Sequence, residues 1–150
     1  MLKGSCACGK IRYEIAGSLN GPVNHCYCQG CRKQSGSGFS STARVEASVM
    51  NVLVGRHLVR SWQHAAGTEH FFASCCGALI YSRDPADLGN LLLPLGTLDC
   101  DPKIGKNLHV DTSSKAAWLP PWGLPVIAEG EEIDPVISSL WVTPKGVPRE

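Results

Sequence analysis

Short hydrophobic runs separated by glycine and proline extend along the whole chain and predict strands rather than helices. Residues 11–15 alternate hydrophobic and polar side chains with a period of two, which is typical of a half-buried strand. The same reasoning predicts further strands at 23–26, 39–49, 51–54, 58–62, 69–73, 78–82, 90–98 and 108–110. We therefore expect a mainly β fold.

Several local features of this pattern make narrower predictions. Residues 51–54 and 58–62 are expected to pair across a turn at Gly55. Pro94 interrupts the most hydrophobic run and favours an edge strand or a bulge. The polar tract 32–38 predicts a loop, whereas 45–50 is equally compatible with a strand and a helical turn. Nearer the C-terminus we expect a surface turn at 120–123 and short strands as far as 141–142.

The size and charge of the chain limit its architecture and partners. Its 150 residues fit one domain, 1–150. The sequence has neither a secretory leader nor an apolar run of about 18 residues, so we expect a soluble cytoplasmic protein that does not bind membranes. The net charge is +1 and no block of about five like charges occurs. These features argue against nucleic acid as a partner and favour a small molecule.

Eight cysteines carry the most specific chemical signal. In a reducing compartment, clustered thiols are expected to bind metal or to react rather than to form structural disulfides. Cys26, Cys28 and Cys31 follow the spacing C-x-C-x-x-C, which suits zinc ligands. A fourth ligand could come from His25, from Cys100 or from outside the protein. His25 is a poor co-ligand for Cys26 because consecutive strand residues point to opposite faces.

The charge of such a site indicates which chemistry it supports. Three thiolates on one Zn²⁺ leave a net charge of about −1, which disfavours activation of water. A soft centre of this kind suits a further sulfur ligand, so it could hold a thiolate beside a carbonyl electrophile. Arg32 and Lys33 would offset the negative charge or bind a substrate carboxylate. A purely structural zinc remains an alternative. A redox dithiol is less favoured, because the C-x-C and C-C pairs lack the C-x-x-C spacing at a helix N-terminus, although Cys28-Gln29-Gly30-Cys31 taken alone matches that spacing.

Two further cysteine pairs suggest a second metal site. Cys6 and Cys8 lie near the N-terminus, and Cys75 and Cys76 directly precede Gly77. A strand, thiols with glycine and another strand are the parts of a small zinc knuckle, since glycine permits the tight turn that points sulfurs inward.

The ordered set of motifs resembles the glutathione-dependent formaldehyde-activating enzymes and their centromere protein V relatives. The resemblance covers about residues 2–125 and implies a β-tent, in which small twisted antiparallel sheets surround two zinc sites. It also implies addition of glutathione to formaldehyde, formally a carbon–sulfur lyase reaction run backwards. The motifs that carry it are Gly4-Ser5-Cys6-Ala7-Cys8-Gly9, Cys26-Tyr27-Cys28-Gln29-Gly30-Cys31-Arg32-Lys33, Cys76-Gly77, Leu95-Gly96-Thr97-Leu98-Asp99 and His109 with Lys115-Ala116-Ala117-Trp118.

The resemblance assigns metal ligands and exposes one departure. It maps the catalytic zinc onto the C-x-C-x-x-C cysteines. It maps the structural zinc onto Cys6, Cys8 and Cys76, with its fourth ligand at Ala73, which cannot ligate. The second site is therefore rebuilt with Cys75, completed by water on three thiolates, or empty. We favour a site formed by Cys6, Cys8, Cys75 and Cys76.

Other residues with chemical potential have plainer expected roles. Trp118 matches the family and is a candidate for substrate binding, although core packing is the simpler expectation for it and for His109. The remaining histidines are expected to be exposed or hydrogen-bonded in the core. The serines after the cluster could bind a carboxylate but are expected to lie in a solvated loop, and Cys100 is expected to be a bystander. The histidines meant here are His57, His64 and His70, and the serines are Ser35, Ser37 and Ser40.

Three functional hypotheses follow. The first is a zinc-dependent carbon–sulfur lyase that acts on adducts of a small thiol, such as glutathione, with a small carbonyl compound. The second is a non-catalytic, zinc-stapled binding module of the centromere protein V kind. That module would be favoured by a basic tail, which the sequence lacks. The third is a structural protein with two closed zinc knuckles.

Overall fold

Ten strands and one short α-helix make up the described part of this computed structural model, residues 1–64 and 67–119. Single 3₁₀ turns occupy Ala47–Val49, Arg56–Leu58, Leu95–Thr97 and Thr112–Ser114. The elements are β1 (Leu2–Ser5), β2 (Arg12–Ile15), β3 (Asn20–Cys26), α1 (Gln29–Ser35), β4 (Ser40–Glu46), β5 (Met50–Val54), β6 (Val59–Gln63), β7 (Glu69–Ala73), β8 (Leu79–Arg83), β9 (Asn90–Pro94) and β10 (Asn107–Val110).

The strands form two sheets, which confirms the mainly β prediction. One sheet has three strands in the order β1-β2-β5, and the other has seven in the order β10-β3-β4-β9-β8-β7-β6. Strand pairs are antiparallel except β10 with β3, which is parallel, so the expectation of antiparallel sheets was incomplete. The chain returns to the open edge of β3 only after a long connection, and such a connection allows parallel pairing.

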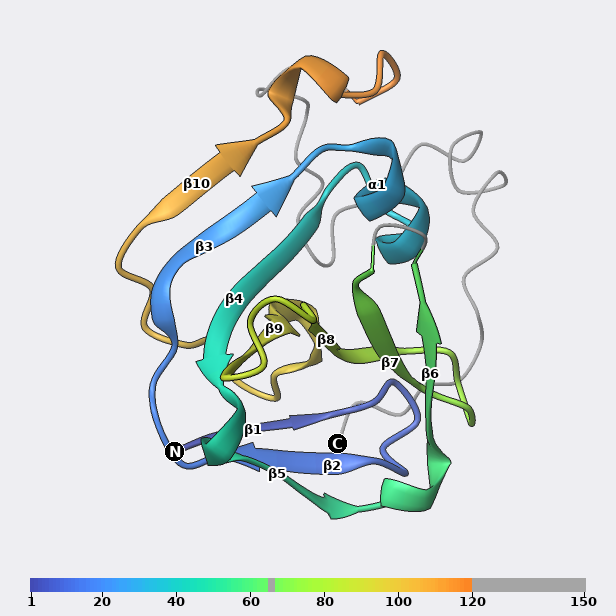
Figure 1. Cartoon of the computed structure of the whole chain (residues 1–150), viewed down its shortest axis with the longest axis vertical. Coiled ribbons are helices and arrows are strands. Elements are labelled where there is room, and N and C mark those ends of the chain that lie inside the picture. The colour runs from blue at the N-terminus through green and yellow to red at the C-terminus, as the bar shows by residue number, and fades with distance from the viewer. Residues whose placement is uncertain (65–66, 120–150) are drawn as a thin grey trace, which may run out of the picture. The chain divides into compact units, whose positions relative to one another are not determined.

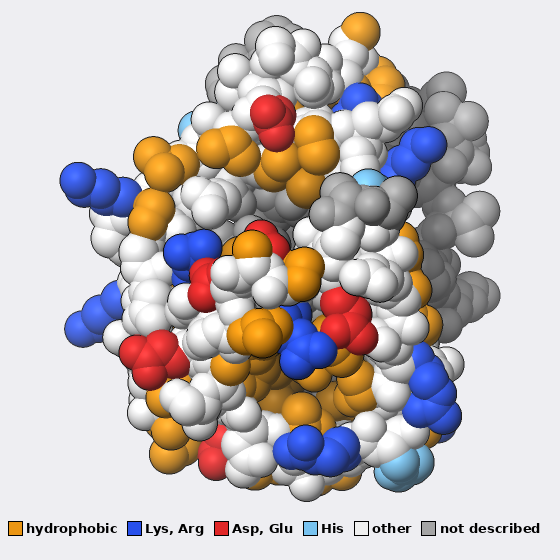
Figure 2. Space-filling model, in the orientation of Figure 1, with side chains coloured by type: hydrophobic (Ala, Val, Ile, Leu, Met, Phe, Trp, Pro, Cys, Tyr) orange, Lys and Arg blue, Asp and Glu red, His pale blue; other side chains and the backbone are white. Residues whose placement is uncertain are grey.

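The larger sheet is strongly curled. Four steps in the strand order separate β3 from β7, which in a flat sheet would be about 19 Å. Figure 1 instead shows β10, β3 and β4 on one side and β6 and β7 facing them across the molecule, with the three-stranded sheet below. Hydrophobic side chains are exposed in a hollow on this face, with charged side chains of both signs around it (Figure 2). The curl brings residues from distant strands towards a common space.

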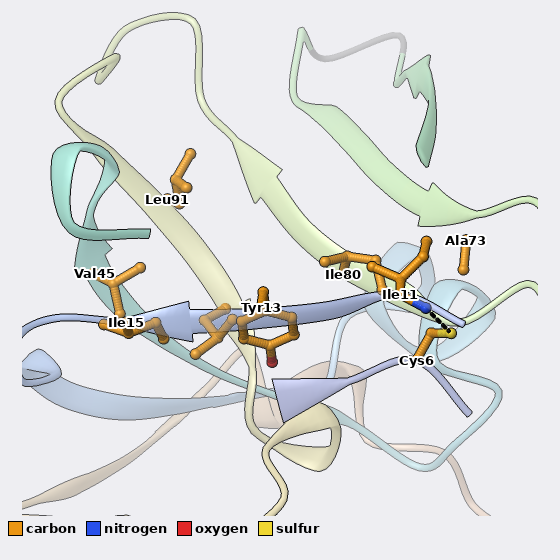
Figure 3. Packing of buried hydrophobic residues seen from close by; sticks show 9 residues of the cluster. Cys6, Ile11, Tyr13, Ile15, Val45, Ala73, Ile80 and Leu91 are labelled. Carbon is orange, nitrogen blue, oxygen red and sulfur yellow. Dashed lines mark hydrogen bonds between the residues drawn. The ribbon is translucent and has the colours of Figure 1, made fainter. Parts of the chain in front are cut away.

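The hydrophobic core joins the two sheets. Alternate residues of β2, Tyr13 and Ile15, are buried against Val45 of β4, Ile80 of β8 and Leu93 of β9. Cys6 and Ala73 belong to the same buried cluster (Figure 3). The core therefore extends to the turn that carries Cys6 and Cys8 and to the turn that carries Cys75 and Cys76.

Two predictions about strand pairing are wrong. The strands β5 and β6 do not pair with each other, because β5 adds to β2 and β6 adds to β7. Gly55 has φ +74°, and the 3₁₀ turn after it carries the chain from the smaller sheet to the larger one. The strand β9 lies between β4 and β8 rather than at an edge. Pro94 is tolerated there because it is the last residue of β9.

The polar tract 32–38 begins within the helix α1, so the predicted loop is wrong for residues 32–35 and correct for residues 36–38. Cys28 is the N-cap of α1, and its sulfur accepts a hydrogen bond from the Cys31 N–H. Gly36 ends the helix in the left-handed conformation at φ +62°. The helix contains no buried residue, so it has no hydrophobic stripe by which the sequence pattern would reveal it.

Residues Met1–Leu119 form one compact unit. The turn at 120–123 and the strands as far as 141–142 lie outside the described residues, and the single domain over 1–150 stays a prediction. Within the described part, no helix has the length and hydrophobicity needed to cross a membrane.

Candidate metal centres

Three cysteine sulfurs converge where β3 meets α1. Cys26 ends β3, Cys28 caps α1, and Cys31 lies in the first turn of that helix. The three sulfurs lie within 4.8 Å of one another. The sharp change from strand to helix at Cys28 accounts for this arrangement, since it turns the chain back on itself between the three side chains.

The donor set fits zinc. Tetrahedral zinc with Zn–S bonds of about 2.3 Å separates its sulfurs by about 3.8 Å. The mutual distances in the cluster are compatible with that spacing. Among the described residues, no histidine, fourth cysteine or carboxylate lies within 4.8 Å of all three sulfurs, so the donor set is three thiols. Such a set leaves one tetrahedral position for a ligand from outside the chain.

The electrostatics of the cluster favour a cation. Burial raises the pKa of the Cys26 thiol to about 12 and also raises the pKa of Cys31. The hydrogen bond from the Cys31 N–H lowers the pKa of Cys28. Two of the three thiols thus resist ionisation on their own. A bound dication would offset that cost, which makes metal binding and proton release coupled events.

The second cluster contains Cys6, Cys8, Cys75 and Cys76, whose sulfurs also lie within 4.8 Å of one another. The sulfur of Cys6 is 3.6 Å from that of Cys8 and 3.9 Å from that of Cys75, while Cys8 and Cys75 are 3.4 Å apart. These separations are close to the edge of a zinc–thiolate tetrahedron, about 3.8 Å. Four thiols fit a closed structural site.

The turn between β7 and β8 shows how adjacent cysteines reach one cluster. Ala73 is fully buried in the core at 0% exposure. Its carbonyl accepts hydrogen bonds from the N–H groups of Cys76 and Gly77, and Gly77 has φ +78°. This tight turn directs both sulfurs towards Cys6 and Cys8. Cys75 therefore occupies the cluster in place of a ligand at position 73.

A cavity of about 970 Å³ adjoins the first cluster. Its lining includes Cys26, Cys28 and Cys31 on one side and Trp62 and His70 of the facing strands. Such a volume suits a small organic ligand. The three-thiol cluster is therefore accessible to a ligand in the cavity.

Arg32 and Lys33 are not among the residues that line this cavity. The helix presents Gly30, Cys31 and Gln34 to the cavity instead. Arg32 uses its Nε to donate a hydrogen bond to the Tyr27 carbonyl at 3.2 Å. This hydrogen bond stabilises the turn between β3 and α1.

His25 does not belong to the three-thiol group, in agreement with its expected poor geometry as a co-ligand. Its Nδ1 lies 2.9 Å from the Ser41 hydroxyl, and its Nε2 lies 3.1 Å from Asn107 Oδ1. The ring also stacks on His109, which is exposed and hydrogen-bonded to the Tyr27 hydroxyl. The predicted core position of His109 is therefore wrong.

Trp118 is 66% exposed, so core packing is wrong for it as well. The described lining of the cavity does not include Trp118. Cys100 is exposed and belongs to neither thiol cluster, as expected for a bystander.

The remaining histidines agree with expectation. His57 and His64 are exposed, whereas His70 is buried and hydrogen-bonded to the Ser82 hydroxyl at 2.8 Å.

Of the serines after the central cysteines, Ser37 lies in an exposed loop as predicted, whereas Ser35 and Ser40 lie in regular elements. Ser35 lies on α1 and donates its hydroxyl to the Cys31 carbonyl at 2.8 Å. Ser40 begins β4, and its hydroxyl donates to the Cys31 sulfur. Both line the cavity, while Ser37 is exposed and outside its lining.

The sequence analysis missed Asp111. Its Oδ2 accepts a hydrogen bond from the Cys26 thiol at 3.5 Å, and its backbone is left-handed at φ +54°. The pairing of Val110 with Cys26 in the parallel strands brings Asp111 there. No local signal predicts that contact, because it depends on strand pairing across the whole domain.

Comparisons with known proteins place these features in context. A profile of the family described as glutathione-dependent formaldehyde-activating enzyme matches residues 1–114. A Halomonas elongata protein named "Putative glutathione-dependent formaldehyde-activating enzyme" is 28% identical over 126 residues, which span 79% of this chain and 80% of the relative. A crystal structure of a Rhodobacter sphaeroides protein has a TM-score of 0.57 at 22% identity, covering 66% of this chain and 89% of that one. This last likeness supports the fold alone.

Proposed function

Because the chain belongs to the glutathione-dependent formaldehyde-activating enzyme family, we propose that it catalyses the addition of a small thiol, such as glutathione, to formaldehyde. The reaction is the reverse of a carbon–sulfur lyase reaction. The observation that carries this proposal is the three-thiol cluster at the wall of a cavity large enough for a small organic ligand. A purely structural site would need a fourth ligand from the protein.

The reaction requires few groups. The thiol sulfur forms a bond to the carbonyl carbon, the carbon–oxygen π bond breaks, and the oxygen takes up the proton that the thiol releases. Zinc bound by Cys26, Cys28 and Cys31 would supply Lewis-acid stabilisation of the substrate sulfur as a thiolate, its nucleophilic form. The chain's own part is to hold the two reactants close together in the cavity.

Polar side chains near the sulfurs suit that positioning role. Ser40 donates to the Cys31 sulfur, which fixes its orientation. Ser41 and Thr42 also line the cavity, and hydroxyl groups can donate to a carbonyl oxygen. In this proposal the cluster of Cys6, Cys8, Cys75 and Cys76 is a second zinc site with a structural role.

The proposal is tested by measuring the catalysed reaction and the zinc content of the same variants. Exchange NMR measures the rate of adduct formation between glutathione and formaldehyde, and metal analysis measures zinc per chain. We expect Cys28→Ser to lower the catalysed rate about 100-fold and to lose one zinc, because a ligand is removed. Cys100→Ser is the matched control, since this exposed thiol belongs to neither cluster.

Binding provides a second readout. In the cobalt-substituted protein, glutathione should change the visible absorption spectrum of the three-thiol site in the wild type and not in Cys28→Ser. Two metal ions that are indifferent to thiols, with no catalysed exchange, would contradict the proposal. That result would favour the non-catalytic zinc-stapled module.

A further inference from the structure

A row of four side chains crosses the wall that faces the thiol cluster. Trp62 of β6 pairs with His70 of β7, His70 pairs with Ser82 of β8, and Ser82 pairs with Leu92 of β9. Directly opposed residues on neighbouring strands point to the same face of a sheet. All four line the cavity that contains the sulfurs of Cys26, Cys28 and Cys31.

The two central residues of the row are buried, whereas Trp62 at its end is partly exposed. Ser82 is buried, and His70 is only 9% exposed, with its Nδ1 held 2.8 Å from the Ser82 hydroxyl. Trp62 remains 46% exposed although its ring centroid lies 4.8 Å from that of His70. The ring of His64 lies 6.0 Å from Trp62 and lines the same cavity. Together these rings form a fixed aromatic surface with part of the indole available for contact.

The charge of the cavity limits what can lie in it. Among the residues that the structure describes, the lining contains no lysine or arginine, and its one carboxylate, Asp99, accepts a hydrogen bond from Ser5 at 2.7 Å. Burial lowers the pKa of His70, which favours the neutral form of this imidazole. The row of Trp62, His70, Ser82 and Leu92 therefore offers no cationic partner to a carboxylate or a phosphate.

Formaldehyde is too small to contact this wall while it reacts at the sulfurs. Its carbonyl carbon carries only hydrogen atoms, so nothing extends from a reacting centre at the sulfurs towards Trp62 and His70. The cavity of about 970 Å³ has room for a larger aldehyde together with the thiol. An uncharged planar substituent would bury apolar surface and stack on the indole, and stacking of aromatic rings is favourable beyond the effect of burial alone.

We propose that the row Trp62, His70, Ser82 and Leu92 is a subsite for the substituent of an aromatic aldehyde, so that this chain forms and cleaves thiol adducts of aldehydes larger than formaldehyde. The inference rests on the proposed function for its chemistry. The bond changes are those of formaldehyde addition: the sulfur–carbon bond forms, the carbonyl π bond breaks, and the oxygen takes the thiol proton. No further reactant is needed.

The kinetic test compares two aldehydes. Exchange NMR gives kcat/KM for glutathione with benzaldehyde and with formaldehyde. Trp62→Ala should lower kcat/KM about tenfold for benzaldehyde and less than twofold for formaldehyde, whereas Trp62→Phe should retain most of the benzaldehyde activity. Leu53→Ala is the control, because Leu53 is a 52% exposed hydrophobic residue of β5 outside the cavity. Equal losses for both aldehydes, or none, would overturn the subsite.

A binding test separates this inference from the proposed function. Calorimetry compares S-benzylglutathione with S-methylglutathione, neither of which can react. The wild type should bind the benzyl compound about tenfold more tightly, and Trp62→Ala should remove that preference. If the wild type accelerates neither aldehyde yet shows this preference, the proposed function fails and the subsite stands. Equal binding of the two compounds, or no binding of either, would refute the subsite.

Discussion

At the scale of single residues, Tyr13 shows how a buried polar group connects distant parts of the chain. Its ring is 1% exposed, and its hydroxyl lies 2.8 Å from Thr97 Oγ1. The ring lies against Gly4, where a Cβ atom would collide with it. Glycine at position 4 therefore lets β1 pack directly on the tyrosine. This packing explains a glycine within a strand, where glycine is otherwise unfavourable.

Tyr13 also predicts a loss of stability in alkali. Burial raises its pKa from 10.0 to about 12. Between these values the unfolded chain releases the phenolic proton and the folded chain retains it, so the free energy of unfolding falls as pH rises. The fall should amount to at most about 3 kcal/mol. Urea unfolding of the wild type and Tyr13→Phe at pH 9 to 12 measures it.

The difference in the free energy of unfolding between the wild type and Tyr13→Phe gives the contribution of the Tyr13 hydroxyl. Tyr13→Phe should be less stable at pH 9 by about 1 kcal/mol, because a hydrogen bond is lost. The gap should narrow as the pH increases. A gap that stays constant across this range would show that Tyr13 does not titrate differently in the two states.

At the scale of elements, α1 combines a structural and a chemical role in one side chain. The Cys28 sulfur accepts the Cys31 N–H and belongs to the thiol cluster. Serine at this position retains a capping oxygen, whereas alanine does not. In zinc-free protein we expect Cys28→Ala to be about 1 kcal/mol less stable than Cys28→Ser. Urea unfolding in the presence of a chelator compares them, and equal stability would show that the cap contributes nothing.

The elements also show which features a sequence reveals. The strand β2 was predictable because the buried Tyr13 and Ile15 alternate with polar residues, and β9 was predictable from its continuous run of leucines. The thiol cluster of α1 was predictable from local spacing. The pairing of β5 with β2 was not, because Gly55 permits either a hairpin or a change of sheet. In the folded chain Gly55 packs closely against the backbone at Lys10, a contact between residues far apart in sequence that has no local signal. The row from Trp62 to Leu92 likewise depends on the register of four strands.

At the scale of the whole molecule, the cluster of Cys6, Cys8, Cys75 and Cys76 connects the two sheets. Cys6 and Cys8 lie between β1 and β2 of the smaller sheet, whereas Cys75 and Cys76 lie between β7 and β8 of the larger one. A metal ion shared by all four would therefore link segments that are far apart in sequence. Such a link stabilises the folded state because the unfolded chain does not preform the site.

This linkage gives a prediction for Cys75. We expect Cys75→Ala to lose one zinc per chain and to lower Tm by about 10 °C, since about 2 kcal/mol of stability would be lost. Metal analysis and calorimetric melting measure the two effects. Cys100→Ala, which removes an exposed thiol outside both clusters, should change neither. Retention of both zinc ions in Cys75→Ala would show that Cys75 is not a ligand.

The parallel pairing of β3 with β10 has a consequence for biosynthesis. The strand that carries Cys26 is translated early, but its neighbour on one side lies about 80 residues later, since Val23 pairs with Asn107. During translation the ribosome therefore releases the first thiols long before the residues that complete their surroundings. Until residues 107–110 have been synthesised and β10 has docked, this edge of β3 is open to pairing with other nascent chains.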